Sequence, residues 1–215
     1  VRDAAHQLRT PLAVLKTQVQ SAQRRDLPPE QALREIGGTV ERAIQLANQM
    51  LALAKVEQLR QQSTPEPAAF DVLLREVALE LSPLIAQHDL DFSIHTEPAA
   101  VRADAWMLRE LARNLLHNAV AHGRSGGTLS VQLVRAGGQA VLTVADSGPG
   151  IPDALAARLY TPFSAGDPRT GSGLGLAICQ DIVQALGGSL TLQNRRGAGG
   201  AVLGLDAVAR LPEAA

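Results

Sequence analysis

The fold follows from a stretch near the start of the chain, AAHQLRTPL at residues 4–12. This stretch begins a series of apolar residues that step by four, three and four, the period of a helical bundle: Leu8, Leu12, Leu15 and Val19. His6 lies outside this series, and Thr10 lies one turn after it on the same helical face. The pattern predicts a helix over residues 1–24 that carries an imidazole on the side of a bundle. On this stretch alone, an ordinary surface histidine is the simpler interpretation.

A second, longer helix is predicted from residue 29 to residue 61, after a turn at residues 26–30. Its apolar residues step by three and four: Leu33, Ile36, Val40, Ala43, Ala47, Met50 and Ala54. Pro11 predicts a bend in the first helix, and Gly37 and Gly38 weaken the second by about 1 kcal/mol each. A hairpin this long and thin cannot bury its own apolar faces, whereas two hairpins can, as a dimeric four-helix bundle. We therefore expect a homodimer.

The composition changes at STPEP, residues 63–67, which is typical of a linker. We expect one domain at residues 1–62 and a second at residues 68–215. In the second domain, apolar periodicity predicts helices at residues 71–87, 104–122 and 174–186. Alternating apolar residues predict strands at residues 89–96, 128–134, 139–145, 189–193 and 201–208. Helices interleaved with antiparallel hairpins indicate an α+β two-layer sandwich.

Two asparagines on the predicted helix 104–122 are the first candidates for a binding site. Asn114 and Asn118 are four residues apart, so their amides point the same way, while Leu111 and Leu115 face the core. Neutral carbonyl oxygens are suitable ligands for Mg²⁺ that already carries phosphate oxygens. Two solvated asparagines at the edge of an apolar face are the alternative interpretation.

Two glycine-rich stretches follow. Asp146 ends a predicted strand and begins DSGPG at residues 146–150, where a carboxylate and close backbone approach suit a ligand with a donor group. GSGLGL at residues 171–176 leads into a helix, whose free N–H groups and dipole favour phosphate. A plain turn and a glycine hinge would look the same, so neither stretch is specific alone.

Five motifs, in order, resemble those of bacterial sensor histidine kinases. They are the phosphoacceptor box at residues 6–12, the N box at 114–119, the G1 box at 146–152, the F box at 159–163 and the G2 box at 171–176. Together they cover essentially the whole chain. The resemblance implies a dimerisation and phosphoacceptor (HisKA) domain, followed by an ATP-binding domain of the Bergerat (GHKL) fold.

The resemblance also implies a role for individual residues. Nε2 of His6 would attack the γ-phosphorus of ATP, and the phosphoryl group would pass to an aspartate of a response regulator. Asn118 would bind Mg²⁺, Asn114 the phosphates, and Asp146 the exocyclic amine of adenine. The remaining candidates around the nucleotide are His122, Gly148, Gly150, Phe163, Gly171, Gly173, Leu174, Gly175 and Leu176. Arg169, in the short polar segment 164–170, is a candidate contact to the γ-phosphate.

The chain departs from the family pattern at several positions. Gln7 stands where most members have Glu or Asp; it can fix the tautomer of His6 but is no general base. We therefore expect autophosphorylation that is slower or more pH-dependent than in a variant with an acidic residue there. His117, Ala121 and the pair Ser164–Ala165 also depart from the common residues. Two interpretations of Thr10 stay open. As the family pattern implies, its hydroxyl would position water for dephosphorylating the regulator, or it would donate a hydrogen bond to a backbone carbonyl of its own helix.

Composition excludes several other classes. A net charge of −1 gives no electrostatic argument for nucleic acid, and the single cysteine, Cys179, excludes an internal disulfide and reads as a core residue. His88 and His95 have no partners at ligand spacing, which argues against zinc. No apolar run reaches the roughly 18–20 residues that span a bilayer. We expect this part of the protein on the cytoplasmic side, with sensor and membrane-spanning segments of the full-length protein in the bacterial inner membrane, as the resemblance implies.

Two alternatives stay open at this point. A GHKL ATPase of the gyrase, chaperone or mismatch-repair type would share the N, G1 and G2 boxes but would have no phosphoacceptor hairpin. A catalytically silent scaffold would dimerise and dock a partner, in keeping with the departures at Gln7, His117 and Ser164–Ala165.

Overall fold

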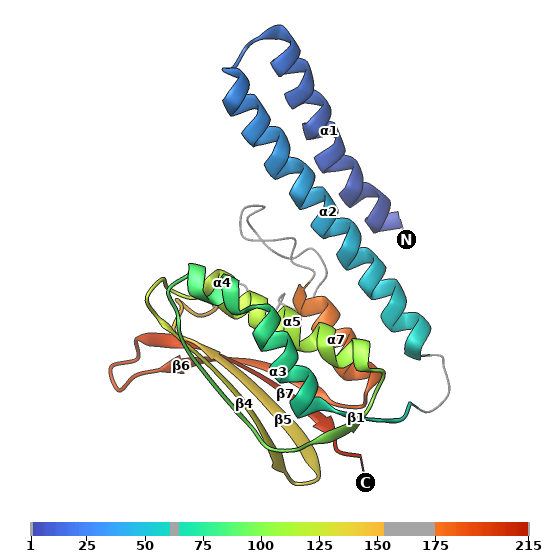
Figure 1. Cartoon of the computed structure of the whole chain (residues 1–215), viewed down its shortest axis with the longest axis vertical. Coiled ribbons are helices and arrows are strands. Elements are labelled where there is room, and N and C mark those ends of the chain that lie inside the picture. Colours follow the sequence, from blue (N-terminus) through green and yellow to red (C-terminus); the bar gives the residue numbers. More distant parts are fainter. Residues whose placement is uncertain (1, 61–64, 153–174, 215) are drawn as a thin grey trace.

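A computed structural model of the chain describes residues 2–60, 65–152 and 175–214, and their side chains except those of residues 2–8 and 45. A long helical hairpin stands against an α/β sandwich (Figure 1). The expected fold class, a helical hairpin followed by a two-layer sandwich, is confirmed.

The hairpin consists of α1 (Arg2–Arg24) and α2 (Pro29–Arg60). α1 continues through Pro11 as one helix, so the expected bend does not end it. Between the two helices lie small or medium side chains from α2, which are buried although the hairpin is thin: Ala32, Thr39 and Leu46. The hydroxyl of Thr39 donates to the Glu35 carbonyl at 3.0 Å and accepts from Arg42 at 2.9 Å, so its burial leaves no polar atom unsatisfied.

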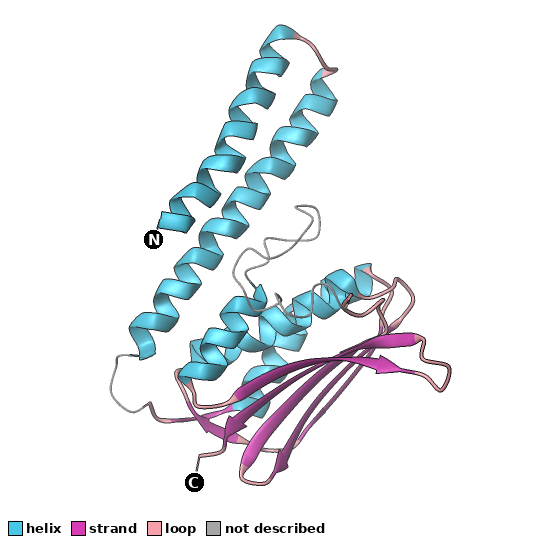
Figure 2. Ribbon diagram, turned by 180° about the vertical axis from the view of Figure 1, so that it is seen from behind, coloured by secondary structure: helices cyan, strands magenta, loops and turns pink. Residues whose placement is uncertain are grey.

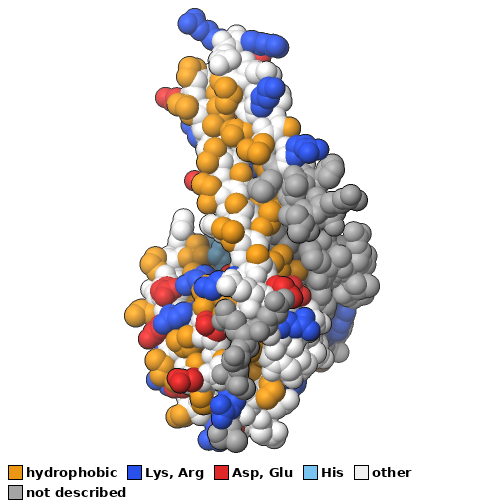
Figure 3. Space-filling view, turned by 90° about the vertical axis from the view of Figure 1, so that its right-hand side faces the viewer, with side chains coloured by type: hydrophobic (Ala, Val, Ile, Leu, Met, Phe, Trp, Pro, Cys, Tyr) orange, Lys and Arg blue, Asp and Glu red, His pale blue; other side chains and the backbone are white. Residues whose placement is uncertain are grey.

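A row of apolar side chains stays exposed along the hairpin. Leu33 and Leu51 are 68% and 69% exposed in the single chain. A row of exposed apolar side chains of this size is typical of an interaction surface. The row, which we name the hairpin stripe, consists of Leu12, Val19, Leu33, Val40, Ile44 and Leu51. Figure 3 shows hydrophobic side chains following the hairpin over most of its length. The helical period therefore supplies one apolar face for the α1–α2 contact and a second that the described chain does not cover.

Among the described residues, five strands form the main sheet in the order β2-β4-β5-β7-β6. These strands are β2 (Asp91–Thr96), β4 (Thr128–Ala136), β5 (Gln139–Asp146), β6 (Ser189–Arg196) and β7 (Val202–Pro212). β2 pairs with β4 in parallel, and the other neighbours are antiparallel. Buried residues alternate with more exposed ones along β4 and β5, so the sheet presents one apolar face to the helices.

Four described helices cover that face of the sheet (Figure 2). They are α3 (Phe70–Glu80), α4 (Ser82–Gln87), α5 (Ala105–His122) and α7 (Gly175–Ala185). α5 begins at Asp104, whose carboxylate accepts from the N–H of Trp106 at 2.8 Å, a standard N-cap. Fully buried side chains from α5, α7 and the sheet meet in the core, among them Leu108, Leu111, Leu115, Ile178, Ile182, Leu129, Leu133 and Leu142.

The structure differs from the sequence-based prediction of this domain in four details. The single helix expected at residues 71–87 is two helices that meet at Leu81, because Pro83 lacks the N–H that a continuous helix needs. The strands β1 (Pro67–Ala69) and β3 (Ala100–Arg102) pair with each other but were not predicted; three residues are too few to show alternation. Pro67, assigned to the linker, begins β1. The parallel pairing of β2 with β4 was not anticipated either.

The C-terminal half of α2 packs against the sandwich beside α7. Ala52 and Val56 are 5% and 3% exposed and belong to the same apolar cluster as the core of the sandwich. The Lys55 ammonium lies 4.2 Å from the ring centroid of Trp106, a cation–π contact between α2 and the first turn of α5. The hairpin is thus anchored at one end. Leu51 of the stripe lies beside this anchor, and the rest of the stripe lies beyond it.

Candidate functional site

The two asparagines of α5 meet the start of α7. A methyl group added to Gly175 would come within 3.1 Å of the Asn114 Oδ1 atom and within 3.6 Å of both polar side-chain atoms of Asn118. The first N–H groups of α7 have no partner within the helix, and the helix dipole gives this end a partial positive charge. The structure therefore brings Asn114, Asn118 and Gly175 together at a place suited to an anion and its counter-cation. Leu176 follows on α7, partly buried against the core.

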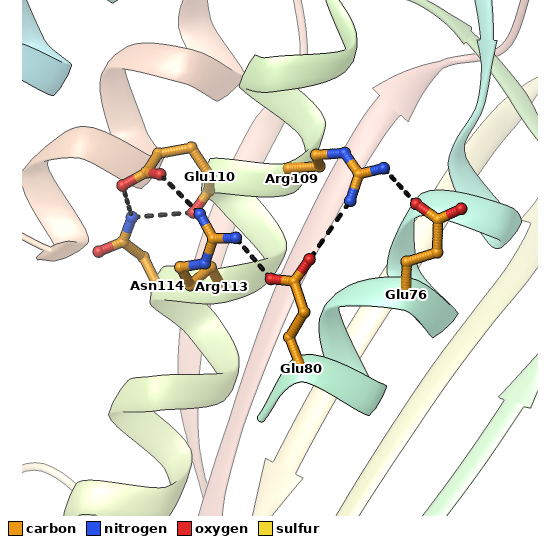
Figure 4. A network of polar contacts seen from close by, with 6 residues as sticks. All are labelled: Glu76, Glu80, Arg109, Glu110, Arg113 and Asn114. Atoms are coloured by element: carbon orange, nitrogen blue, oxygen red, sulfur yellow. Dashed lines mark hydrogen bonds and ion pairs between the residues drawn. The ribbon is translucent and has the colours of Figure 1, made fainter. Parts of the chain in front are cut away.

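Ion pairs join α5 to α3 beside Asn114 (Figure 4). Arg109 pairs with Glu76 and lies 3.6 Å from a carboxylate oxygen of Glu80. Arg113 lies 2.6 Å from the other oxygen of Glu80 and 3.6 Å from Glu110. We name this alternating row of charges the α3–α5 ladder. Each exposed ion pair contributes little to the free energy of unfolding. The α3–α5 ladder matters here because it holds the charged side chains of α5 in fixed directions.

Asp146 ends β5 with a buried carboxylate. Asp146 is only 4% exposed to solvent, and its Oδ1 atom accepts a hydrogen bond from the N–H of Gly148 at 2.7 Å. Burial raises the pKa of Asp146 above its ordinary value; the N–H groups of Gly148 and Leu205 and the charges of Arg195 and His122 oppose that rise. A buried carboxylate with few solvent contacts is a selective acceptor for a ligand amine.

Two glycines let the backbone after Asp146 pass close to its neighbours. A methyl group at Gly148 would lie 2.5 Å from the carbonyl oxygen of His122, the last residue of α5. Gly150 has φ of +71°, and a methyl group there would overlap the side chain of Asn194. Any larger residue would push this turn away from α5 and β6, so the glycines hold the Asp146 carboxylate and the end of α5 in one place.

Two polar residues of β6 complete the turn and were not found from the sequence. Asn194 donates from Nδ2 to the Ile151 carbonyl and accepts from the Ile151 N–H, both at 2.8 Å. Arg195 donates to the backbone carbonyl of Asp146 at 2.8 Å and pairs with Asp206. These contacts join positions 43 and 49 residues apart, so no local pattern in the sequence indicates them.

The other predicted site residues divide into two groups. His6 and Gln7 lie on α1, with side chains outside the described set, and Thr10 is exposed on the same helix. Five residues lie outside the described ranges altogether: Phe163, Arg169, Gly171, Gly173 and Leu174.

Cys179 lies in the core, as the sequence indicated. Cys179 is fully buried, and burial, followed by the charge of Glu110, raises the pKa of its thiol far above the usual range. Within residues 2–60, 65–152 and 175–214, no group of three or more His, Cys, Asp or Glu side chains is arranged to hold a metal ion.

Family models match both parts of the chain. Residues 1–59 match the His Kinase A (phospho-acceptor) domain, and residues 103–214 match the family of histidine kinase-, DNA gyrase B-, and HSP90-like ATPases. The chain belongs to the bacterial sensor histidine kinases. The second match makes the α/β domain of this histidine kinase an ATP-binding domain, and the first argues against a gyrase- or chaperone-type ATPase.

Individual relatives agree with this assignment. The histidine kinase chain is 34% identical over 196 residues to the sensor protein kinase PmrB of Pseudomonas aeruginosa, covering 88% of this chain and 41% of PmrB. Its fold matches that of the Acinetobacter baumannii histidine kinase AdeS, with a TM-score of 0.76, 22% identity, and coverage of 96% of this chain and 97% of that one. It also matches the histidine kinase ThkA, crystallised in complex with the response regulator protein TrrA, with a TM-score of 0.74, 21% identity, and coverage of 99% and 60%.

The chain spans about half or less of the length of the curated relatives it matches, such as PmrB at 41%. None of the described helices is long and apolar enough to cross a membrane.

The raised pKa of Asp146 makes a prediction about stability. The folded protein holds the Asp146 proton more tightly than the unfolded chain does, so stability is lost as pH rises from about 4 through the folded-state pKa. Asp146→Asn retains an oxygen for the Gly148 N–H but does not titrate. We expect the variant to gain stability relative to the wild type as pH rises through this window. Urea unfolding at a series of pH values measures the difference, and a difference that stays constant with pH would contradict the prediction.

Proposed function

We propose that this histidine kinase chain is a catalytic core that transfers the γ-phosphoryl group of ATP to His6 and then to an aspartate of a response regulator. One observation carries the proposal: a phosphoacceptor-type hairpin and an ATP-binding domain occur in a single chain, at residues 1–59 and 103–214. The division into residues 1–62, a linker at 63–67 and residues 68–215 is part of this proposal.

The base of the nucleotide would bind at the Asp146 turn. Its exocyclic amine donates to the buried carboxylate, and Gly148 and Gly150 allow the close turn against α5 and β6 that holds this carboxylate in place. The phosphates extend toward the start of α7, where Gly175 and Leu176 present helix N–H groups. The family motif adds Gly171, Gly173 and Leu174 before this helix, with Phe163 and Arg169 from the preceding segment.

The two asparagines of α5 that lie beside the start of α7 fit a magnesium ion. Asn114 and Asn118 bring amide groups to the same point, and neutral oxygens are suitable for Mg²⁺ that phosphate oxygens already surround. When bound, Mg²⁺ would neutralise phosphate charge and orient the terminal phosphoryl group. We assign Asn118 as a direct ligand, following the family motif.

The chemical step takes place on α1. Neutral His6 attacks through Nε2, so that an N–P bond forms, the bond from the γ-phosphorus to the bridging oxygen breaks, and ADP leaves. The ring then loses its Nδ1 proton. Gln7 accepts a hydrogen bond from Nδ1–H and fixes the tautomer, but it cannot take the proton, which must pass to solvent. Phosphohistidine then takes up a proton from solvent at Nδ1 and donates the phosphoryl group to an aspartate, so that N–P cleavage restores neutral His6.

A response regulator is the proposed partner. ThkA, whose fold this chain shares, was crystallised with a response regulator protein, which supports docking of such a partner here. Thr10 is exposed one turn after His6 and would position water if the chain also dephosphorylates the regulator. The relatives are sensor proteins, which supports a full-length protein in the bacterial inner membrane with this part on the cytoplasmic side.

The second copy of this chain is the proposed partner of the hairpin stripe. Leu33, Val40, Ile44 and Leu51 repeat on one face of α2, and two such faces packed together make a four-helix bundle. The family match to a phosphoacceptor domain at residues 1–59 supports the same arrangement.

Radiolabelling tests the proposed reaction. Incubation with γ-labelled ATP and Mg²⁺ should give label that is acid-labile and alkali-stable, because the N–P bond of phosphohistidine behaves in this way. His6→Ala should lose the label but bind nucleotide as the wild type does, since residue 6 lies on α1 and not at the Asp146 turn. Phosphate release without label would instead support an ATPase, and neither label nor release would support a silent scaffold.

Light scattering tests the dimer. Ile44→Arg places a charge in the centre of the hairpin stripe, where 55% of the residue is exposed in the single chain, and should convert a dimer to a monomer. Gln31→Arg adds the same charge on an exposed position of α2 outside the stripe and should leave the dimer intact. A wild-type monomer at micromolar concentration, or an equal effect of both variants, would contradict the proposed interface.

A further inference from the structure

The side chain of Glu110 turns inward, one helical turn before Asn114 on α5. It is only 17% exposed, unlike Glu76 and Glu80 of the ladder at 47% and 49%. Glu110 lines a cavity between α2 and α5, together with Asn48, Lys55 and Trp106. Glu110 is therefore placed differently from an ordinary surface member of an ion-pair row.

The Asn114 amide is held by Glu110 through two hydrogen bonds. Its Nδ2 donates to the Glu110 backbone carbonyl at 2.8 Å and to the Oε1 atom of the same residue at 2.9 Å (Figure 4). Both NH₂ hydrogens are thus engaged. A flipped amide would place its oxygen against two acceptor oxygens, so the chemistry of the neighbours determines the orientation.

This orientation sends the Asn114 oxygen toward the nucleotide site. Oδ1 is the atom that lies within 3.1 Å of a methyl group added at Gly175, at the start of α7. An amide that presents oxygen attracts a cation and repels phosphate oxygens, whereas one that presents NH₂ does the opposite. Without Glu110, nothing on α5 except the backbone carbonyl would favour the first orientation over the second.

The ladder holds Glu110 in turn. One carboxylate oxygen, Oε1, accepts from Asn114, and the other, Oε2, lies 3.6 Å from Arg113. Arg113 is bound at 2.6 Å to Glu80 of α3, which also lies near Arg109. Each oxygen of Glu110 therefore has its own partner, and the rotation that would release Asn114 also costs the contact with Arg113.

We propose that Glu110 is a positioning residue of the nucleotide site, which holds the amide of Asn114 with its oxygen toward the magnesium ion. The proposal rests on the proposed nucleotide site and deepens it. Glu110 touches neither nucleotide nor metal; it acts through Asn114, and the α3–α5 ladder buttresses it. It also moves Asn114 from a contact of the phosphates, the role implied by the family motif, to the metal side of the site.

Nucleotide affinity with and without metal tests this role. A fluorescent ATP analogue is titrated into the wild type, Glu110→Ala and Glu110→Gln, once with Mg²⁺ and once with EDTA. Glutamine keeps a carbonyl oxygen at the same reach but loses the charge, so it can still hold the Asn114 amide. Glu66→Ala removes an exposed glutamate outside the ladder and serves as the control. Urea unfolding shows that each variant is folded.

We expect Glu110→Ala to weaken binding about tenfold with Mg²⁺, the loss of one charge-assisted hydrogen bond, and to leave binding in EDTA unchanged. Glu110→Gln should stay within about threefold of the wild type under both conditions. An equal loss with and without Mg²⁺ would make Glu110 a structural residue and overturn the proposal, as would no loss at all. A Glu110→Gln variant as weak as Glu110→Ala would show that charge, not orientation, matters, and would also overturn it. A wild type that binds no nucleotide under either condition would refute the proposed function itself, a distinct result.

Discussion

The helical period of α5 places the asparagines of the nucleotide site directly beside leucines of the core. Leu111 and Leu115 are almost completely buried between α7 and the sheet, and the residues beside them on the same helix, Asn114 and Asn118, therefore lie at the edge of the core. Neither set can move without the other. Because a packed interior tolerates little displacement, the amide groups are held at the start of α7 before any ligand arrives.

The sandwich and the hairpin differ in how completely they bury their apolar side chains. The sandwich has a complete core of its own, with side chains at or near zero exposure from three helices and the sheet. The hairpin buries Ala52 and Val56 against that core, and Lys55 lies over Trp106. Farther along the hairpin, the apolar side chains of the hairpin stripe stay exposed. The anchored end fixes the hairpin near the ATP-binding domain, and the exposed end is where a second hairpin would pack.

Periodicity predicted most of the fold, because helices and half-buried strands repeat their apolar residues over many positions. The helix at 104–122 was correct almost to the residue, since Asp104 is a capping residue and the leucines follow at helical spacing. β1 and β3 were missed because strands of three residues carry no period, and the interruption at Leu81 was missed although Pro83 signalled it. The pairing of β2 with β4 depends on contacts that are far apart in the chain.

The site was predictable where its residues lie within one motif and not where they come from elsewhere. Asn114, Asn118, Asp146 and Gly148 stand in short, family-typical stretches, and the structure brings the two asparagines to α7 and Gly148 to the end of α5. Asn194 and Arg195 reach the Asp146 turn from β6, and nothing near them in sequence marks them. Glu110 lies within the same helix as the asparagines, but its role depends on the side-chain direction that the ladder imposes.

The central claim is that one nucleotide spans the Asp146 turn and the start of α7. Chemical-shift mapping by NMR with a non-hydrolysable ATP analogue and Mg²⁺ tests it most directly. The account requires the largest changes at the side-chain amides of Asn114 and Asn118 and at the backbone N–H groups of Gly148, Gly150 and Gly175. Changes confined to the hairpin, or to the contact between Lys55 and Trp106, would contradict it.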